Sequence, residues 1–156
     1  MRKATFSITH NDEEMLALIQ DTDQKTLAVW AIDCAERVLP YFEQHFPDDH
    51  RPRYAIEALQ LWLQTGVFQM AVIRKASLDS HAAARDLGAD TAARSAARAA
   101  GQAVATAHVP RHAYGSAVYA QQAIYRATNS AEADAATARE RDWQYSHLLQ
   151  LRENNP

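Results

Sequence analysis

The stretch from Ser80 to His108 constrains the fold of this chain most, because it is almost saturated with alanine. Alanine has the highest helix propensity and the smallest side chain that still carries a Cβ atom, so helices rich in it can pack with their backbones close together. A few long polar side chains interrupt the alanines at helical spacing: His81, Arg85, Arg94, Arg98 and His108. We expect two closely packed helices here, the second of which, over about residues 91–107, lies centrally in the molecule.

Helical periodicity extends over the rest of the chain, and no segment shows the strict alternation of a half-buried strand. Pro40 is expected to kink or divide one helix and Pro110 to begin another, whereas Gly66 and Gly88 are expected to end helices. The expected helices cover about residues 12–20, 23–42, 52–65, 68–87, 91–107, 110–128 and 130–151. The prediction is an all-α fold: a single compact bundle of about seven helices with a central alanine-rich helix.

The length of 156 residues is that of one ordinary domain, which can bury a core without disulfides or metal ions. Cys34 is the only cysteine, and its apolar neighbours indicate a packed thiol in a reducing compartment. No apolar run is long enough for a signal peptide or a membrane span. We therefore expect a single cytoplasmic domain over residues 1–156, with frayed ends at about 1–8 and 152–156.

The net charge of -3 hides an uneven distribution along the chain. Residues 12–57 contain eleven acidic and four basic side chains, whereas residues 74–126 contain seven basic and three acidic ones. Either the two regions pack together and neutralise each other, or the acidic region forms an exposed face for a basic partner. The candidate partner-binding residues on that face are Asp12, Glu13, Glu14, Asp21, Asp23, Glu43 and Asp48.

Direct binding of nucleic acid is disfavoured by the same distribution. The basic side chains of residues 74–126 are spread through an alanine-rich core pattern, and no interleaved aromatic residues form a platform on which bases could stack.

His108 and His112 are the first candidate functional group. On a continuous helix they would share one face at the four-residue spacing that metal sites often use. Pro110 lies between them and weakens this interpretation, and a third ligand would have to come from His81, His50 or an acidic residue. We expect no metal ion and no other cofactor.

A second candidate group consists of charged residues on two expected helices and the loop between them: Asp33, Arg37, Asp49, Arg53 and Glu57. One interpretation is an ion-pair network that ties these helices together. The other is general acid and base catalysis by paired carboxylates, which requires a dry pocket that raises the pKa of one of them. Arginines so near would keep these carboxylates ionised.

A third candidate group is the stripe of arginine and histidine in the alanine-rich region, made of Arg74, His81, Arg85, Arg94 and Arg98. These side chains could cradle a phosphate or a carboxylate. Alternatively, they reach the acidic residues of the preceding helices. No glycine-rich phosphate loop, nucleophile elbow or paired Cys-x-x-Cys site is present.

Several blocks of this sequence resemble one family. They are DCAERVLP at residues 33–40, DHRPRYAIEA at 49–58, HAAAR at 81–85, AARAAGQAVATAH at 96–108 and HAYG at 112–115. They resemble the Imm-five-like family of bacterial immunity proteins, and the resemblance spans about residues 30–127. It implies a small all-helical cytosolic protein that protects a bacterium by binding and blocking a toxin, and it implies no catalytic residues. The motif positions are Asp33, Arg37, Arg53, Glu57, His81, Arg85, Arg98, His108 and His112, and the chain departs from the family pattern at Pro110.

Three functions are therefore open at this point. The first is a non-catalytic binder that neutralises a protein toxin, for example a nuclease, through the acidic face of residues 12–57. The second is an enzyme, or a protein that binds a small ligand or metal, with a polar pocket around His81, His108 and His112. The third is a structural helical module that forms a homodimer through aromatic side chains, for which Trp62, Phe68 and Trp143 are candidates.

Overall fold

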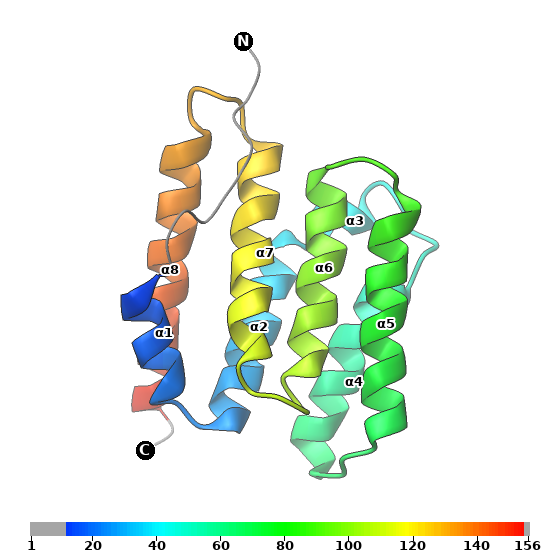
Figure 1. Cartoon of the computed structure of the whole chain (residues 1–156), viewed down its shortest axis with the longest axis vertical. Coiled ribbons are helices and arrows are strands. Elements are labelled where there is room, and N and C mark those ends of the chain that lie inside the picture. Colours follow the sequence, from blue (N-terminus) through cyan, green and yellow to red (C-terminus); the bar gives the residue numbers. More distant parts are fainter. Residues whose placement is uncertain (1–11, 155–156) are drawn as a thin grey trace.

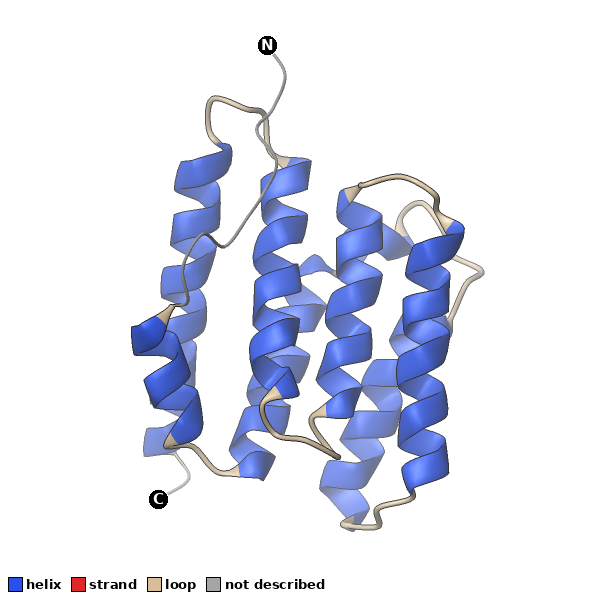
Figure 2. Ribbon diagram, in the orientation of Figure 1, coloured by secondary structure: helices blue, strands red, loops and turns tan. Residues whose placement is uncertain are grey.

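The computed structural model describes residues 12–154, and within that range the chain forms eight helices and no strand (Figure 2). The all-α prediction is confirmed. The helices are α1 (Glu13–Gln20), α2 (Gln24–Val38), α3 (Pro40–Glu43), α4 (Arg51–Thr65), α5 (Met70–Asp86), α6 (Ala92–Ala105), α7 (His112–Ala127) and α8 (Ala133–Glu153).

The helices form two layers, with α5, α6, α7 and α8 side by side in front and α2 and α4 behind them (Figure 1). Helix α6 contacts α5 and α7 within its own layer and α2, α3 and α4 in the other. Six of its alanines are buried: Ala93, Ala96, Ala97, Ala99, Ala100 and Ala103. The predicted central position of the alanine-rich helix is therefore confirmed.

Small side chains let the backbone of α6 approach its neighbours closely enough for short serine hydroxyls to reach backbone carbonyls. Ser80 on α5 donates to the carbonyl of Ala97 at 2.8 Å, and Ser77 donates to that of Gly101 at 2.9 Å. Ser116 on α7 donates to Ala99 of α6 at 3.0 Å. These buried hydroxyls are thus hydrogen-bonded inside the contacts that alanine makes possible.

The larger core side chains lie between α2 and its neighbours. Trp30, Phe42 and Leu59 have no exposed surface, and Cys34 is also fully buried. The indole Nε1 of Trp30 donates to the backbone carbonyl of Gln144 at 2.8 Å and so joins α2 to α8. Burial raises the pKa of the Cys34 thiol well above its usual value, as expected for a packed thiol.

The predicted helix ends hold best where proline or glycine fixes the backbone. Pro40 divides the expected long helix into α2 and α3, which gives eight helices where about seven are predicted. Gly66 and Gly88 follow α4 and α5 with φ of 69° and 65°, in the left-handed region that glycine favours. Helix α8 begins at Ala133, three residues later than expected, and continues to Glu153, although the sequence predicts fraying from about residue 152. The expected fraying of residues 1–8 falls outside the described residues.

Candidate functional site

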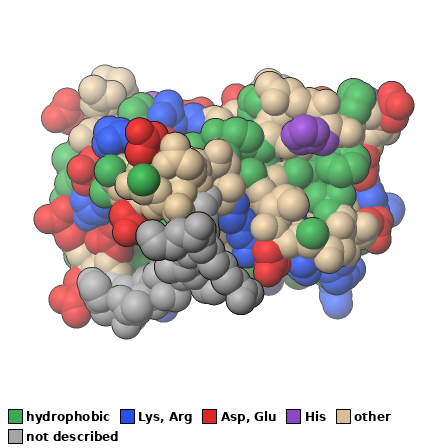
Figure 3. Space-filling model, turned by 90° about the horizontal axis from the view of Figure 1, so that it is seen from above, with side chains coloured by type: hydrophobic (Ala, Val, Ile, Leu, Met, Phe, Trp, Pro, Cys, Tyr) green, Lys and Arg blue, Asp and Glu red, His purple; other side chains and the backbone are tan. Residues whose placement is uncertain are grey.

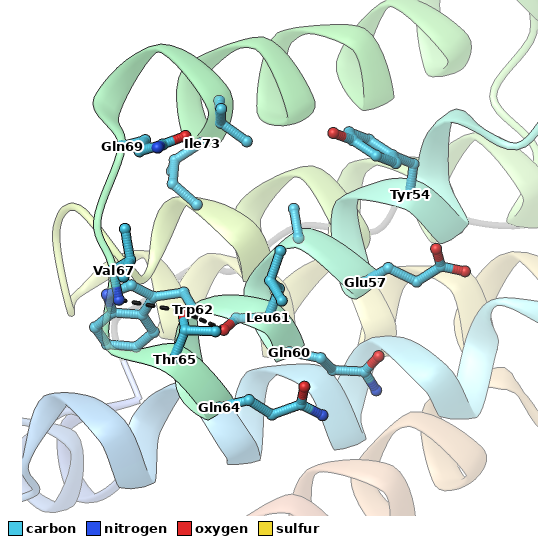
Figure 4. A pocket seen from close by; sticks show the side chains of 12 residues that line it. Tyr54, Glu57, Gln60, Leu61, Trp62, Gln64, Thr65, Val67, Gln69 and Ile73 are labelled. Atoms are coloured by element: carbon cyan, nitrogen blue, oxygen red, sulfur yellow. Dashed lines mark hydrogen bonds between the residues drawn. The ribbon is translucent and has the colours of Figure 1, made fainter.

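An apolar groove lies between α4 and α5 at the end where residues 66–69 connect them (Figure 4). It encloses about 530 Å³. Leu61 stands in its middle, with Trp62 and Val67 towards one end and Tyr54 and Glu57 towards the other. The connection is held by a hydrogen bond from the backbone N–H of Val67 to Oγ1 of Thr65 at 3.1 Å.

Exposed large apolar side chains gather around this groove. Helices α4 and α5 and the connection between them carry seven of the ten such residues among those described: Tyr54, Leu61, Val67, Phe68, Met70, Val72 and Leu78. Leu61 is 58% exposed and Val67 61% exposed, which is unusual for aliphatic residues of a folded chain. Tyr54, Leu61, Val67 and Val72 line the groove itself, and exposed apolar side chains clustered in this way are typical of a surface that another molecule covers.

A smaller hollow of about 180 Å³ lies on the other side of α5, against α6. Its lining includes Met70 and Leu78, and Phe68 beside it stacks on the ring of His108 with 6.2 Å between the ring centroids. The apolar surface therefore continues around the connection from the α4–α5 groove to the lower end of α6.

The sequence predicts no site at this groove. Of its lining residues, only Glu57, expected in the ion-pair network, and Trp62, expected with nearby Phe68 in a dimer contact, are among the candidates. Trp62 is nearly buried, whereas Phe68 is exposed, and Trp143 lies on α8 at the opposite side of the molecule (Figure 1). The three aromatic residues thus do not share one surface. The sequence did contain an indication of the groove. Apolar residues continue past Gly66, into a connection between helices where polar residues are usual.

The predicted pairing of Asp33 with Arg37 is wrong. Arg37 instead donates from Nε and Nη2 to both carboxylate oxygens of Glu140 on α8, at 2.8 and 2.9 Å, and Asp33 accepts from Nε2 of His147 at 2.7 Å. The Arg37 guanidinium also lies 3.8 Å from the ring centroid of Trp143, which stacks on His147. These five residues close the seam between α2 and α8, which lie at distant points of the sequence.

Of the other members of the predicted network, Arg53 and Asp49 form ion pairs with residues outside it, and Glu57 forms none among residues 12–154. Arg53 donates to Glu43 at 2.8 Å and to Glu36 at 3.3 Å, and its guanidinium lowers the pKa of the Glu43 carboxyl. Arg51, which sequence analysis did not select, binds Asp49 at 2.7 Å and Asp86 of α5 at 2.9 Å. Glu57 is exposed at the rim of the apolar groove and has no ion pair within 4 Å among residues 12–154.

His81 and Arg98 meet between α5 and α6. Arg98 donates from Nη1 to Nδ1 of His81 at 2.9 Å, and because a guanidinium cannot accept, Nδ1 must be unprotonated. The ring lies flat against Gly101, where a Cβ atom would come within 2.8 Å of Nε2. Burial, followed by the charges of Arg98 and Arg85, lowers the pKa of His81 to about 4, so the ring is neutral near pH 7.

His112 makes a separate contact between α7 and α6. Its Nδ1 donates to Oε1 of Gln102 at 2.9 Å, and Gly115 gives that amide room, because a Cβ there would lie 2.7 Å from Oε1. Burial lowers the pKa of His112. His108 belongs to the turn after α6, so it does not share a continuous helix with His112. Within residues 12–154, no three histidine, cysteine or acidic side chains converge as a metal would require.

The seven predicted partner-binding acids do not form one face. Asp12, Glu13, Glu14, Asp21 and Asp23 lie at α1 or the start of α2, whereas Glu43 and Asp48 lie near α3 on the other side of the molecule (Figure 1). Arg141 of α8 binds Asp12 at 2.8 Å and Glu14 at 3.0 Å, and Arg152 binds Asp21 at 2.8 Å. Asp23 caps α2 by accepting from the N–H of Thr26, which lowers the pKa of its carboxyl.

The acidic region packs against residues 74–126, and Arg51 pairs with Asp86 across them, but the bases of residues 74–126 make no ion pairs with its acids. Among the described residues, no ion pair joins an acid of residues 12–57 to a base of residues 74–126. The side formed by α1, α2 and α8, residues 12–38 and 132–154, carries twelve acidic and five basic side chains. Residues 39–131 carry seven acidic and nine basic ones. Seen from above, red acidic side chains accordingly gather on the left, where α1 and α8 lie (Figure 3).

Helices of residues 12–154 are all too short or too polar to cross a lipid bilayer. No curated protein matches this chain, and no solved structure matches it. The sequence model of one family, described as Imm-5 like putative immunity protein, matches residues 17–151 and so includes α2 to α7 entirely, together with the groove and the two polar helix contacts. This chain belongs to the Imm-5 like family of immunity proteins.

Proposed function

We propose that this protein binds and neutralises a protein toxin without catalysis of its own, and that the apolar groove between α4 and α5 is the centre of that contact. Family membership implies a protein partner in general terms. The observation that carries the choice of surface is the clustering of exposed apolar side chains around Leu61. The core of a protein interface is made of such anchors, and they supply most of its binding energy.

The shape of the groove favours a helix of the toxin as the segment that binds. Residues 54, 57, 61 and 65 of α4 follow helical spacing along one wall, over about 17 Å at 1.5 Å per residue. Three turns of an amphipathic helix match that length and would present apolar residues at positions i, i+4 and i+7. Glu57 at the rim favours a basic residue on the toxin helix.

The test is growth of a bacterium that produces a candidate toxin, with and without this protein. We expect the wild-type chain to restore growth. Leu61→Asp should abolish protection and weaken toxin binding at least about tenfold, because a carboxylate in an apolar interface loses its hydration. Leu149→Asp on α8 is the matched control, since Leu149 is also an exposed leucine, and it should protect like the wild type. Equal behaviour of the two variants would refute the groove as the docking surface.

The acidic side formed by α1, α2 and α8 is the second candidate surface, because its excess of twelve acids over five bases favours a basic toxin. Glu13 and Glu153 are exposed there and lie outside the ion pairs of the described residues. If this surface binds, Glu13→Lys with Glu153→Lys should weaken binding and raised salt should slow association steeply. Binding through the groove should depend only weakly on salt. A homodimer that covers the groove would be detected by light scattering as a doubled mass that Leu61→Asp abolishes.

The alternative of a polar pocket for a small ligand, or an enzyme site, has less support. His81, His108 and His112 each bind a different neighbour, namely Arg98, Phe68 and Gln102, and do not converge on one hollow. We expect the wild-type protein to protect growing cells. The same protein, once purified, should turn over neither the toxin nor small substrates.

A further inference from the structure

Arg98 differs from most half-buried arginines of this protein because it lacks an acidic partner. No carboxylate of residues 12–154 lies within 4 Å of it, and its one hydrogen bond there goes to the neutral ring of His81. A guanidinium has five N–H donors, and the bond to His81 uses one of them. The other four donors make no hydrogen bond with residues 12–154.

His81 holds this guanidinium in place. The ring cannot retreat, because it already lies against the backbone of α6 at Gly101. The bond of 2.9 Å therefore fixes the orientation of the Arg98 fork relative to α5 and α6. A fixed guanidinium loses less conformational entropy when it binds a two-oxygen ligand than a mobile one does.

The charge of a second arginine acts on both Arg98 and His81. Arg85 of α5 lies one helical turn from His81, is exposed, and has no ion pair among the described residues. Its charge and that of Arg94 both lower the pKa of Arg98, as does burial, which is the largest cause. The nearby carboxylate of Asp90 is already shared by Arg94 and Arg126, at 3.4 and 3.6 Å. Tyr119 of α7 is the remaining titratable group whose charge acts on Arg98.

We propose that Arg98, held by His81, and Arg85 form a binding site for a phosphate group on the face of α5 and α6. The class of ligand follows from the charges, because two guanidinium groups without a carboxylate are balanced by a dianion rather than by a single carboxylate. The neutral His81 accepts from Arg98 and adds no charge. This inference does not depend on the toxin-binding proposal, because the groove and this site use different residues.

The test is a titration of the full-length protein with inorganic phosphate at constant ionic strength, followed by NMR of the arginine side chains and the His81 ring. Phosphate should shift the Arg98 and Arg85 signals and raise the pKa of His81, because a bound dianion offsets the field of the arginines. Arg98→Gln should weaken phosphate binding at least about tenfold, and acetate should bind at least about tenfold more weakly than phosphate to the wild type.

Arg74→Gln is the matched control, since Arg74 is an exposed arginine on the same helix, outside the pair. It should change the phosphate affinity less than about twofold. The proposal is overturned if Arg98→Gln binds phosphate like the wild type, if Arg74→Gln weakens binding as much, or if acetate binds equally well. Growth protection against the toxin, measured on Arg98→Gln, separates failure of this site from failure of the groove.

Discussion

Arg37 and Arg98 occupy similar places in two different helix contacts, and their surroundings are opposite. Arg37 at the α2–α8 seam donates to both oxygens of the buried Glu140 and lies over Trp143, so its charge is balanced within the chain. Arg98 at the α5–α6 contact meets a neutral histidine and other arginines. The first arrangement stabilises the fold, whereas the second leaves a positive charge available to bind a ligand. Charged motif residues of one family can thus serve structure and binding on neighbouring helices.

The largest effect should come from breaking the seam. Glu140→Ala removes the carboxylate that holds Arg37, and Glu140 is only 5% exposed. We expect the free energy of unfolding to fall by about 2–3 kcal/mol, less than for a fully buried pair because the Arg37 side chain is partly hydrated. Urea unfolding measures this loss. Glu43→Ala, which breaks the exposed pair with Arg53, is the control and should lower the free energy by less than about 1 kcal/mol. Equal losses of unfolding free energy in the two variants would mean that the buried pair at the seam stabilises the fold no more than the exposed pair does.

The next effect should come from the titration of His81. The pKa of His81 is lowered from about 6.5 to about 4 in the folded state. Between pH 6.5 and pH 4 the ring is therefore protonated in the unfolded chain but not in the folded one. Stability is therefore fully present above pH 6.5 and is lost as the pH falls towards 4, by about 1–2 kcal/mol after allowance for partial exposure of the ring. Thermal unfolding of wild type and His81→Gln at several pH values tests this. A loss of the same size in both proteins would assign it to other groups.

The smallest effect on stability should come from Arg98 itself. Arg98→Gln removes a charge that has no acidic partner, so the free energy of unfolding should change by less than about 0.5 kcal/mol. Arg37→Gln, the same exchange at the seam, should lower it by about 1–2 kcal/mol because Glu140 then loses its counter-charge. Chemical unfolding of the two variants side by side gives the difference. A larger loss for Arg98→Gln than for Arg37→Gln would reverse the comparison of the two contacts.

Sequence patterns predicted the helices well because helix formation depends mainly on local properties. Alanine content placed α6 at the centre, and Pro40, Gly66 and Gly88 marked helix ends through their own backbone preferences. Ion-pair partners depend on which helices pack, which spacing along the chain does not contain. Asp33 and Arg37 stand four residues apart on α2, yet both reach α8, more than 100 residues later.

The candidate sites were predictable only in part for the same reason. The stripe of His81, Arg85 and Arg98 was selected, and the structure brings these residues together, because alanines leave only a few long side chains on that face. The groove was missed because an exposed leucine such as Leu61 has the same helical spacing as a buried one. The position of α5 decides which side of α4 faces solvent. That position depends on tertiary packing, which the sequence pattern of α4 does not contain.

The packing of α6 has a consequence for how relatives of this protein can diverge. Helices pack on several sides of α6, and at Gly101 even a Cβ atom would require His81 to move. Random mutation will therefore be purged along the inner surface of α6. The inner surface of α6 thus acts as an invariable scaffold, and evolutionary freedom is confined to residues outside it.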